Sequence, residues 1–257
     1  MKLFLLAAAA TATATATATV HATAVKPMST QPHVGVGLLG CGWFSRRAHV
    51  PVLASFERAS AQQGANDPTP SKALGGRQGN KNLKFSLRVN AVCTTSEESV
   101  KKALKFLSSR LGRRDIACYT NLESLIADEK VQIIIVALPI ALQATAIQRI
   151  LKAGKHAISE KPAVASADEA ATLWATYQQN CNTSEWCVLE NWAYKLGVQR
   201  VRTLLNNGIV GNVVRYELNL TQSFPNTDVQ TGWRSNARQT YAGGHVLDVG
   251  VHIVRAC

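Results

Sequence analysis

The sequence predicts an α/β fold built on a parallel sheet, followed by the beginning of an α+β domain. From residue 34 onward, short β-branched runs alternate with longer segments of helical periodicity, which is typical of βαβ units. The chain has 257 residues, of which 46% are hydrophobic, and this is enough for one full core and part of a second. The pattern therefore indicates a globular chain of two unequal domains.

The expected strands and helices follow from the spacing of the apolar residues. A strand is expected where a short apolar run is bounded by turn residues, and a helix where apolar residues recur three or four positions apart. The expected strands are 34–39, 87–93, 116–119, 131–138, 156–159, 186–190 and 213–220. The expected helices are 46–58, 97–109, a short one that opens at 121, 144–151, 167–179 and 198–205. A polar stretch over 61–82 fits neither period and is interpreted as a surface insertion.

The charge, cysteine and hydropathy patterns argue against several classes of protein. The net charge of +12 would suit nucleic acid, but the basic residues are dispersed in pairs, so we expect no nucleic-acid partner. Such a basic surface also suits a phosphorylated cofactor. The six cysteines lack CxxC spacing, so we expect buried free thiols and no metal site, and only Cys181 and Cys187 raise a pairing question. Beyond the amino terminus no segment offers the roughly 18 apolar residues of a membrane span, so we expect no membrane partner.

The amino-terminal segment bears on the location of the protein. Lys2 and the apolar run behind it resemble the start of a signal peptide, with a small-residue cleavage site at 22–24. A Thr-Ala repeat over 11–19 is barely hydrophobic, however, and Met28 directly precedes the first strand. A start at Met28 would give a cytosolic protein. We therefore expect a cytoplasmic location, with a secretory or organellar one as the alternative if residues 1–24 are a genuine targeting segment.

Two overlapping stretches fit the glycine pattern of a dinucleotide-binding loop, G-x-G-x-x-G. Residues 35–40 match every letter, whereas residues 40–45 end in Ser where Gly or Ala is commoner. The loop must follow a strand and open a helix, so that backbone N–H groups and the helix dipole meet the pyrophosphate. Only the second stretch leaves room for a strand before it; the alternative is a strand and turn that bind no ligand. We assign the phosphate loop to Gly40, Gly42, Trp43, Phe44 and Ser45.

The choice of cofactor depends on the end of the second strand, where an acid would bind the ribose 2′-OH of NAD. That strand is followed by Thr94, Thr95 and Ser96, and the first acid is Glu97. Hydroxyl groups accept a 2′-phosphate more readily than a carboxylate does, and the lysine pair at 101–102 could assist. NADP is therefore favoured and NAD stays possible. The alternative is that these small polar residues only cap the helix that follows.

Three blocks of residues, in a fixed order, resemble a known family. The first is Gly-Leu-Leu-Gly-Cys-Gly-Trp at 37–43, with His49 and Pro51 behind it. The second and most specific runs from Ala-Gly-Lys-His at 153–156 into Glu-Lys-Pro, and the third extends from Gly243 to His252. Together they resemble the glucose-fructose oxidoreductase, inositol dehydrogenase and MocA family over about residues 33–256.

The resemblance implies a division of the chain into three parts. Residues 1–30 form a low-complexity or targeting-like segment. Residues 31–163 form a Rossmann-type dinucleotide-binding domain. Residues 164–257 form the start of an α+β domain with an open sheet, which serves substrate binding or oligomerisation in the family. Family members continue beyond this length, so the chain is interpreted as truncated at its carboxyl terminus.

The resemblance also implies which residues do the chemistry. Oxidising a secondary alcohol requires a group that takes the hydroxyl proton while hydride leaves for the nicotinamide. In the family the lysine of the Glu-Lys-Pro motif, here Lys161, hydrogen-bonds the reacting oxygen, and His252 accepts the proton. Asp248 lies four residues before His252, on the same face of a helix, and in the family pattern it binds or orients nearby. Taken alone, an Asp/His pair at this spacing is more often an ordinary hydrogen bond. The other cofactor contacts implied are Leu138, Pro139, Gln143, Glu160 and Pro162.

The implied substrate is a sugar, polyol or related hydroxy compound, and its expected contacts are Asn191, Trp233 and Arg234. Ala193 stands where many members carry Arg, so this part of the substrate site departs from the family pattern. A homo-oligomer is expected for a full-length relative rather than for this chain. The alternative to an NAD(P)-dependent oxidoreductase is a fragment or scaffold that binds nucleotide without turnover.

Overall fold

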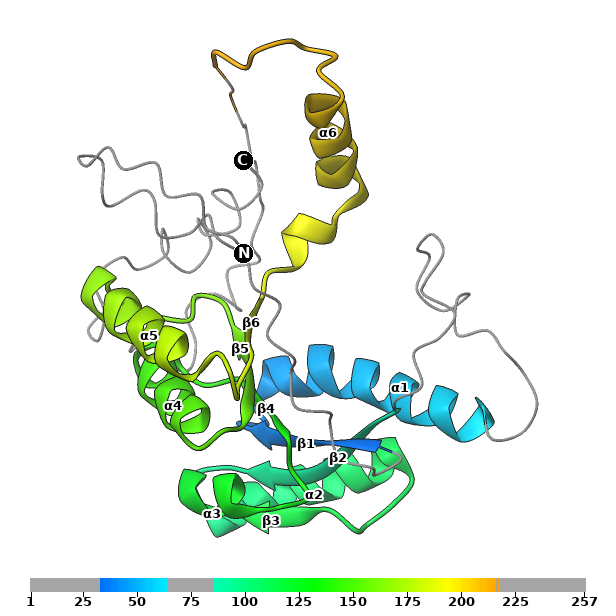
Figure 1. Cartoon of the computed structure of the whole chain (residues 1–257). Coiled ribbons are helices and arrows are strands. Elements are labelled where there is room, and N and C mark those ends of the chain that lie inside the picture. The colour runs from blue at the N-terminus through cyan, green and yellow to red at the C-terminus, as the bar shows by residue number, and fades with distance from the viewer. Residues whose placement is uncertain (1–32, 64–85, 216, 218–257) are drawn as a thin grey trace, which may run out of the picture.

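A computed structural model of the chain describes residues 33–63, 86–215 and 217 (Figure 1). Within them six strands, all parallel, form one sheet in the order β3-β2-β1-β4-β5-β6. The strands are β1 His33–Leu39, β2 Ser86–Cys93, β3 Ala117–Tyr119, β4 Ile133–Val136, β5 His156–Glu160 and β6 Trp186–Leu189. From β1 the strands are added toward one edge of the sheet as far as β3, and from β4 they are added toward the other edge as far as β6. Ligands of open α/β sheets bind outside the carboxyl ends of the strands at the point where this order reverses, here between β1 and β4. The predicted α/β fold of Rossmann type is confirmed.

Helices cover both faces of this sheet. They are η2 Ser45–His49, α1 Val50–Gln63, α2 Glu97–Leu111, α3 Leu122–Ala127, α4 Ile140–Lys152, α5 Ala167–Asn180, η3 Asn191–Tyr194 and α6 Leu196–Asn206. On one face α1 packs against α2, and on the other α4 packs against α5 (Figure 1). Each face buries its own apolar cluster: Leu38 and Leu107 belong to the first, Ile147 and Leu173 to the second, and all four side chains are fully buried. Because the central strands are buried on both sides, they read as continuous apolar runs.

One irregularity interrupts the pairing of β1 with β2. Val36 pairs with Val89 and Gly37 with Ala91, so Asn90 is an extra residue in β2 and forms a bulge. The backbone N–H of Val89 donates to Glu57 Oε1 (2.6 Å), and the Val89 carbonyl accepts from Arg113 Nη2. Arg113 in turn pairs with Glu57 at 2.9 Å. Two side chains thereby satisfy backbone groups at the bulge.

Most predicted elements are confirmed to within a few residues, and three differ for physical reasons. Strand β4 is shorter than the predicted 131–138. Val131 is buried, but its backbone N–H donates to the Asp128 carbonyl oxygen (3.1 Å) in a turn instead of to a neighbouring strand. Helix α4 begins at Ile140 instead of 144, with Pro139 as its N-cap. Proline is tolerated there because backbone N–H groups at the start of a helix have no partner within the helix, so the missing N–H of proline costs nothing. The predicted strand 213–220 does not form over its described residues, of which Val214 is 97% exposed. The amino-terminal segment and most of the predicted insertion lie outside the described residues.

The cysteines follow the prediction only in part. Cys41 and Cys93 are buried free thiols, and burial raises the pKa of Cys93 to about 11. Cys181 and Cys187 are also free but exposed, so the expectation of burial is wrong for both. Cys181 follows the last turn of α5, and Cys187 lies on β6, which has a single neighbouring strand among the described residues. In the same part of the chain no helix is both long and apolar enough to cross a membrane. Nor do three His, Cys, Asp or Glu side chains gather there as a metal site.

Candidate functional site

The predicted phosphate loop begins where β1 ends, at the carboxyl edge of the sheet. Gly40 has φ +90°, and a Cβ atom there would lie 2.4 Å from the carbonyl oxygen of Ala137, so a side chain is excluded. Gly42 faces open space, with no atom within 4 Å of the position its Cβ would take. Ser45 is 1% exposed and donates its hydroxyl to the Gly40 carbonyl oxygen at 2.9 Å. The serine that replaces the usual third glycine therefore closes the loop.

The competing glycine stretch serves packing inside β1. A Cβ on Gly35 would lie 1.7 Å from the carbonyl oxygen of Lys130, and a Cβ on Gly37 would lie 2.9 Å from Leu125 Cδ1. Both glycines are needed because neighbouring segments approach the strand closely. The loop thus begins at Gly40, as predicted. That it binds a pyrophosphate stays a prediction, and the open face of Gly42 leaves room for one.

The helix that follows the loop opens with a π-helical turn, η2. This wider turn buries Ser45 and His49, while Arg46 and Arg47 are directed outward. Arg46 Nε donates to the Cys41 carbonyl oxygen at 2.9 Å. Free N–H groups at the start of a helix and two adjacent guanidinium groups both favour an anion at this point.

The residues after β2 cap α2, which was the alternative interpretation of Thr94, Thr95 and Ser96. Ser96 is the N-cap: its hydroxyl accepts from Ser99 N (3.3 Å), and Ser99 Oγ accepts from Ser96 N (3.1 Å). The hydroxyl of Thr94 lies 2.7 Å from Ser99 Oγ. Thr95 is exposed. Two of the three hydroxyl groups are therefore already engaged in holding the start of this helix.

The connection from β4 to α4 lies against the phosphate loop. Leu138 Cδ2 comes within 3.4 Å of the position of a Cβ on Gly40, and Pro139 is the N-cap of α4. Gln143 is 1% exposed and donates from Nε2 to the Pro162 carbonyl oxygen at 2.9 Å. Its Oε1 atom is buried without a hydrogen-bond partner among the described residues. Gln143 is therefore a buried side chain that hydrogen-bonds the backbone of Pro162. Its contact with the nicotinamide stays a prediction.

The end of β5 carries Glu160, Lys161 and Pro162. Glu160 Oε1 lies 2.9 Å from His49 Nε2, and the two side chains are only 14% and 8% exposed. The ring N–H of His49 is not aligned with that oxygen, so the contact is a close electrostatic one rather than a well-formed hydrogen bond. The second oxygen of Glu160 accepts from the backbone N–H of Lys161 at 3.3 Å. Glu160 thus connects the helix behind the phosphate loop to the residue predicted to be catalytic.

The predicted substrate residues are described only in part. Asn191 is exposed and begins η3, directly after Glu190, whose carboxylate accepts from Trp192 N at 2.8 Å. Trp233, Arg234, Asp248 and His252 lie outside the described residues. The structure therefore brings Lys161 and the phosphate loop to one edge of the sheet, and leaves the Asp/His pair as a prediction.

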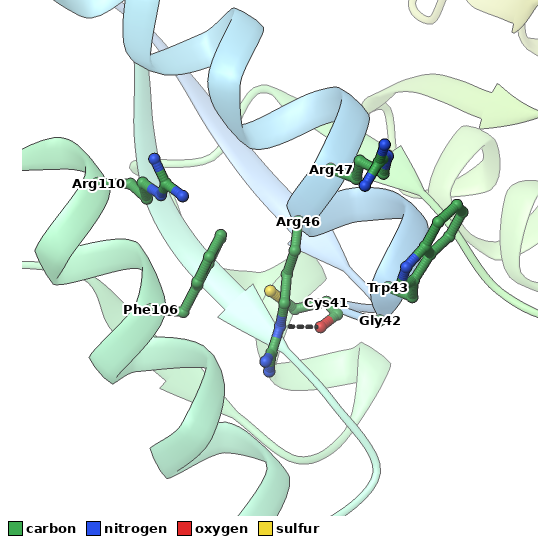
Figure 2. A pocket seen from close by; sticks show the side chains of 7 residues that line it. All are labelled: Cys41, Gly42, Trp43, Arg46, Arg47, Phe106 and Arg110. Atoms are coloured by element: carbon green, nitrogen blue, oxygen red, sulfur yellow. Dashed lines mark hydrogen bonds between the residues drawn. The ribbon is translucent and has the colours of Figure 1, made fainter.

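A pocket of about 570 Å³ lies between the phosphate loop and α2 (Figure 2). Besides Cys41, Gly42 and Trp43, it is lined by Arg46, Arg47, Phe106 and Arg110. The contribution of α2 could not be predicted from the sequence, because Phe106 and Arg110 follow the loop by some sixty residues and only folding brings them near it. The contact of His49 with Glu160 was not predicted either; the only signal for it in the sequence is that both residues belong to the family-like blocks.

Comparison with known proteins identifies relatives of this chain. The family model described as "Oxidoreductase family, NAD-binding Rossmann fold", GFO_IDH_MocA, matches residues 34–184. A dehydrogenase, FPY6, of Fusarium mangiferae is 26% identical over 229 residues, which cover 86% of this chain and 56% of that protein. A scyllo-inositol 2-dehydrogenase (NADP(+)), IolW, of Bacillus subtilis is 24% identical over 65% of this chain and 42% of its own. The chain thus spans about half the length of these curated relatives.

A solved structure supports the fold. The crystal structure of an NAD binding oxidoreductase from Klebsiella pneumoniae superposes with a TM-score of 0.65 and 18% identity, covering 88% of this chain and 52% of the other. At that identity the likeness concerns the fold. The family model covers more than half of the chain and includes both the phosphate loop and the Glu-Lys-Pro segment. The chain therefore belongs to the GFO/IDH/MocA family of oxidoreductases with an NAD-binding Rossmann fold.

Proposed function

We propose that this protein transfers hydride between a nicotinamide cofactor and a hydroxyl-bearing carbon of a sugar, polyol or related compound, with NADP favoured over NAD. The observation that carries the proposal is the position of Lys161 at the end of β5, on the edge of the sheet that also bears the phosphate loop. The open face of Gly42 and the tight turn at Gly40 fit the close approach of a pyrophosphate. The nicotinamide, when bound, accepts or gives the hydride.

The chain's own residues divide the remaining work. The backbone N–H groups at the start of the helix after Gly42 bind the pyrophosphate. The ammonium group of Lys161 donates a hydrogen bond to the reacting oxygen and stabilises the charge that develops there. His252 accepts the hydroxyl proton, and Asp248 orients its ring. Asn191, Trp233 and Arg234 bind the remainder of the substrate.

The substrate class is supported by a relative and by the residue types of the proposed substrate contacts. The Bacillus subtilis relative is named for a polyol, scyllo-inositol, and for NADP(+), and it shares 24% of its residues with this chain over the matched region. The proposed substrate residues combine amide, indole and guanidinium groups, which bind hydroxyl groups by hydrogen bonds and by stacking. A cytoplasmic location belongs to the same proposal, and fractionation of cells that express the whole sequence tests it.

The deciding experiment combines binding with turnover. The purified chain is titrated with NADPH and NADH by fluorescence and then assayed for nicotinamide reduction with a panel of inositols and aldoses. Lys161→Met should lower kcat/KM by about 10²-fold or more, because it removes the group that polarises the reacting oxygen, while nucleotide affinity stays within about twofold. Lys152→Met is the charge-matched control and should change neither quantity. Lys152 is exposed at the carboxyl end of α4, whereas the amino end of that helix lies next to the phosphate loop.

The outcomes separate this proposal from its alternative. Nucleotide binding without turnover on any hydroxy compound would favour a non-catalytic nucleotide-binding fragment or scaffold. Unchanged turnover in Lys161→Met would contradict the assignment of Lys161. Absence of binding for both nucleotides would contradict the cofactor site itself.

A further inference from the structure

The pocket beside the phosphate loop has the size and position of a binding site. Its volume of about 570 Å³ falls within the roughly 300–1,000 Å³ of small-molecule sites. Gly42 and Trp43 of the loop form one side, and Phe106 and Arg110 of α2 form the other (Figure 2). In Rossmann folds the adenosine ribose lies between the phosphate loop and the end of the second strand, from which the second helix leaves. The loop side of the pocket, at Cys41 and Gly42, therefore adjoins the place where that ribose would lie, while Phe106 and Arg110 belong to the last two turns of α2.

Aromatic rings hold the cationic groups of this pocket in place. The guanidinium carbon of Arg46 lies 5.3 Å from the centre of the Phe106 ring, and that of Arg110 lies 5.5 Å from the same ring. Arg47 lies 5.5 Å from the centre of the Trp43 ring. Stacking of this kind lowers the entropy that each long side chain would lose on binding an anion. In Figure 2 the Phe106 ring stands between the Arg46 and Arg110 side chains, so one ring contacts both cations, and both line the pocket.

These positive charges have no carboxylate partner in the described part of the chain. None of the salt bridges there includes Arg46, Arg47 or Arg110. Arg46 is half-buried, and it uses only Nε, which bonds the Cys41 carbonyl oxygen, so its two terminal nitrogens remain available. Paired terminal nitrogens of arginine match the oxygens of a phosphate group in a bidentate arrangement.

Three of the groups that the sequence suggested for a 2′-phosphate are engaged elsewhere, whereas Thr95 and Lys101 are exposed. Thr94 and Ser96 hydrogen-bond Ser99 at the start of α2. Lys102 pairs with Glu98 at 2.6 Å, one turn earlier on the same helix. The arginine pocket is thus a further cationic site, next to the phosphate loop, that has unused donors among the described residues.

We propose that this pocket binds the phosphate monoester on the adenosine ribose of NADP, with Arg46 as its main ligand and Arg110 as the second. The inference rests on the proposed function, because it requires the loop to bind a nicotinamide dinucleotide. It assigns the preference for NADP to side chains of η2 and α2 instead of the hydroxyl groups that follow β2. The ligand chemistry is a dianionic phosphate monoester, whether free or attached to the ribose.

The test measures the dissociation constants of NADPH and NADH for the wild-type chain and two variants. Arg46→Met should weaken NADPH binding by about 10- to 100-fold, as expected for the loss of charge-assisted hydrogen bonds, and leave NADH within about twofold. Because Arg46 also bonds the loop backbone, Arg110→Met is the second variant; it leaves the loop contacts intact and should weaken NADPH alone. Lys152→Met is the control for loss of one positive charge.

Smaller probes separate the sources of the phosphate. Adenosine 2′,5′-bisphosphate should bind the wild type more tightly than 5′-AMP, and Arg46→Met should abolish the difference; 5′-AMP with added inorganic phosphate should not reproduce it. Equal losses for NADPH and NADH in both variants, or no loss in either, would overturn the pocket inference while leaving the cofactor proposal intact. A wild-type preference for NADH would overturn it as well. Failure of the wild type to bind either nucleotide would overturn both.

Discussion

The contact between His49 and Glu160 should couple the helix behind the phosphate loop to the end of β5, and His49→Leu tests this. The variant leaves the Glu160 carboxylate, which is 14% exposed, without its nearest partner. Leaving a buried acceptor unsatisfied costs about 1–3 kcal/mol in the free energy of unfolding. For a chain of this size that amounts to roughly 2–12 °C in Tm. Because the contact is electrostatic rather than a well-formed hydrogen bond, the interaction itself should reach no more than about 1.5 kcal/mol, the lower end of the range of about 1.5–3 kcal/mol for hydrogen bonds to charged groups.

A double-mutant cycle measures that interaction directly. Urea unfolding of the wild type, His49→Leu, Glu160→Gln and the double variant should yield a coupling free energy between about 0.5 and about 1.5 kcal/mol. His156 supplies a matched control, because it lies at the other end of β5 and its ring accepts from Glu185 N (3.0 Å) instead of contacting a carboxylate. The cycle of His156→Leu with Glu160→Gln should be additive within about 0.5 kcal/mol. A coupling below that limit for His49 and Glu160 would refute the reasoning.

Two further predictions concern the loop and the response to acid. Gly40→Ala should lower the free energy of unfolding by at least about 1–2 kcal/mol, because of its positive φ and the Ala137 carbonyl, as urea titration would show. Gly42→Ala should change that free energy by less than about 0.5 kcal/mol yet weaken both nucleotides, and unchanged affinity would contradict the loop assignment. A hydrogen bond from Arg113 lowers the pKa of Asp115, so the stabilisation from this carboxylate is complete above its unfolded pKa of about 3.9 and is lost as pH falls through the folded value. The stability difference between wild type and Asp115→Asn should therefore shrink from about pH 6 to about pH 3; because Asp115 is 60% exposed, the effect is small, and a difference that grows on acidification would contradict it.

The strands were predictable because parallel strands buried on both faces leave long apolar runs in the sequence. The same signal overextends β4: Val131 is apolar because it packs in the core, although it lies in a turn. Periodicity placed the helix after the loop to within a residue of its start but gave no sign of the π-helical turn Ser45–His49, which adds a residue to the usual repeat. Apolar spacing therefore reports burial well and backbone hydrogen bonding less well.

The candidate site was predictable where it is local in the chain. The phosphate loop could be placed because the strand before it and the helix after it are adjacent in sequence. The role of the residues after β2 could not be decided, because Ser96 is equally suited to capping and to phosphate binding, and only the hydrogen bonds to Ser99 distinguish the two. The arginine pocket depends on packing of α1 against α2, a contact between segments that no local pattern encodes.

The bulge at Asn90 decides which face of the sheet the end of β2 presents. Val89 packs with the cluster beneath α1 and α2, whereas Ala91 packs with the cluster on the opposite face, although residues two apart in a regular strand share a face. After the bulge the alternation continues in the new phase, with Val92 toward α1 and α2 and Cys93 away from them. Without the extra residue, every side chain from position 91 onward would exchange faces. The direction in which the chain leaves β2 toward α2, the helix whose last two turns line the arginine pocket, is thus set by a single inserted residue three positions before the strand ends.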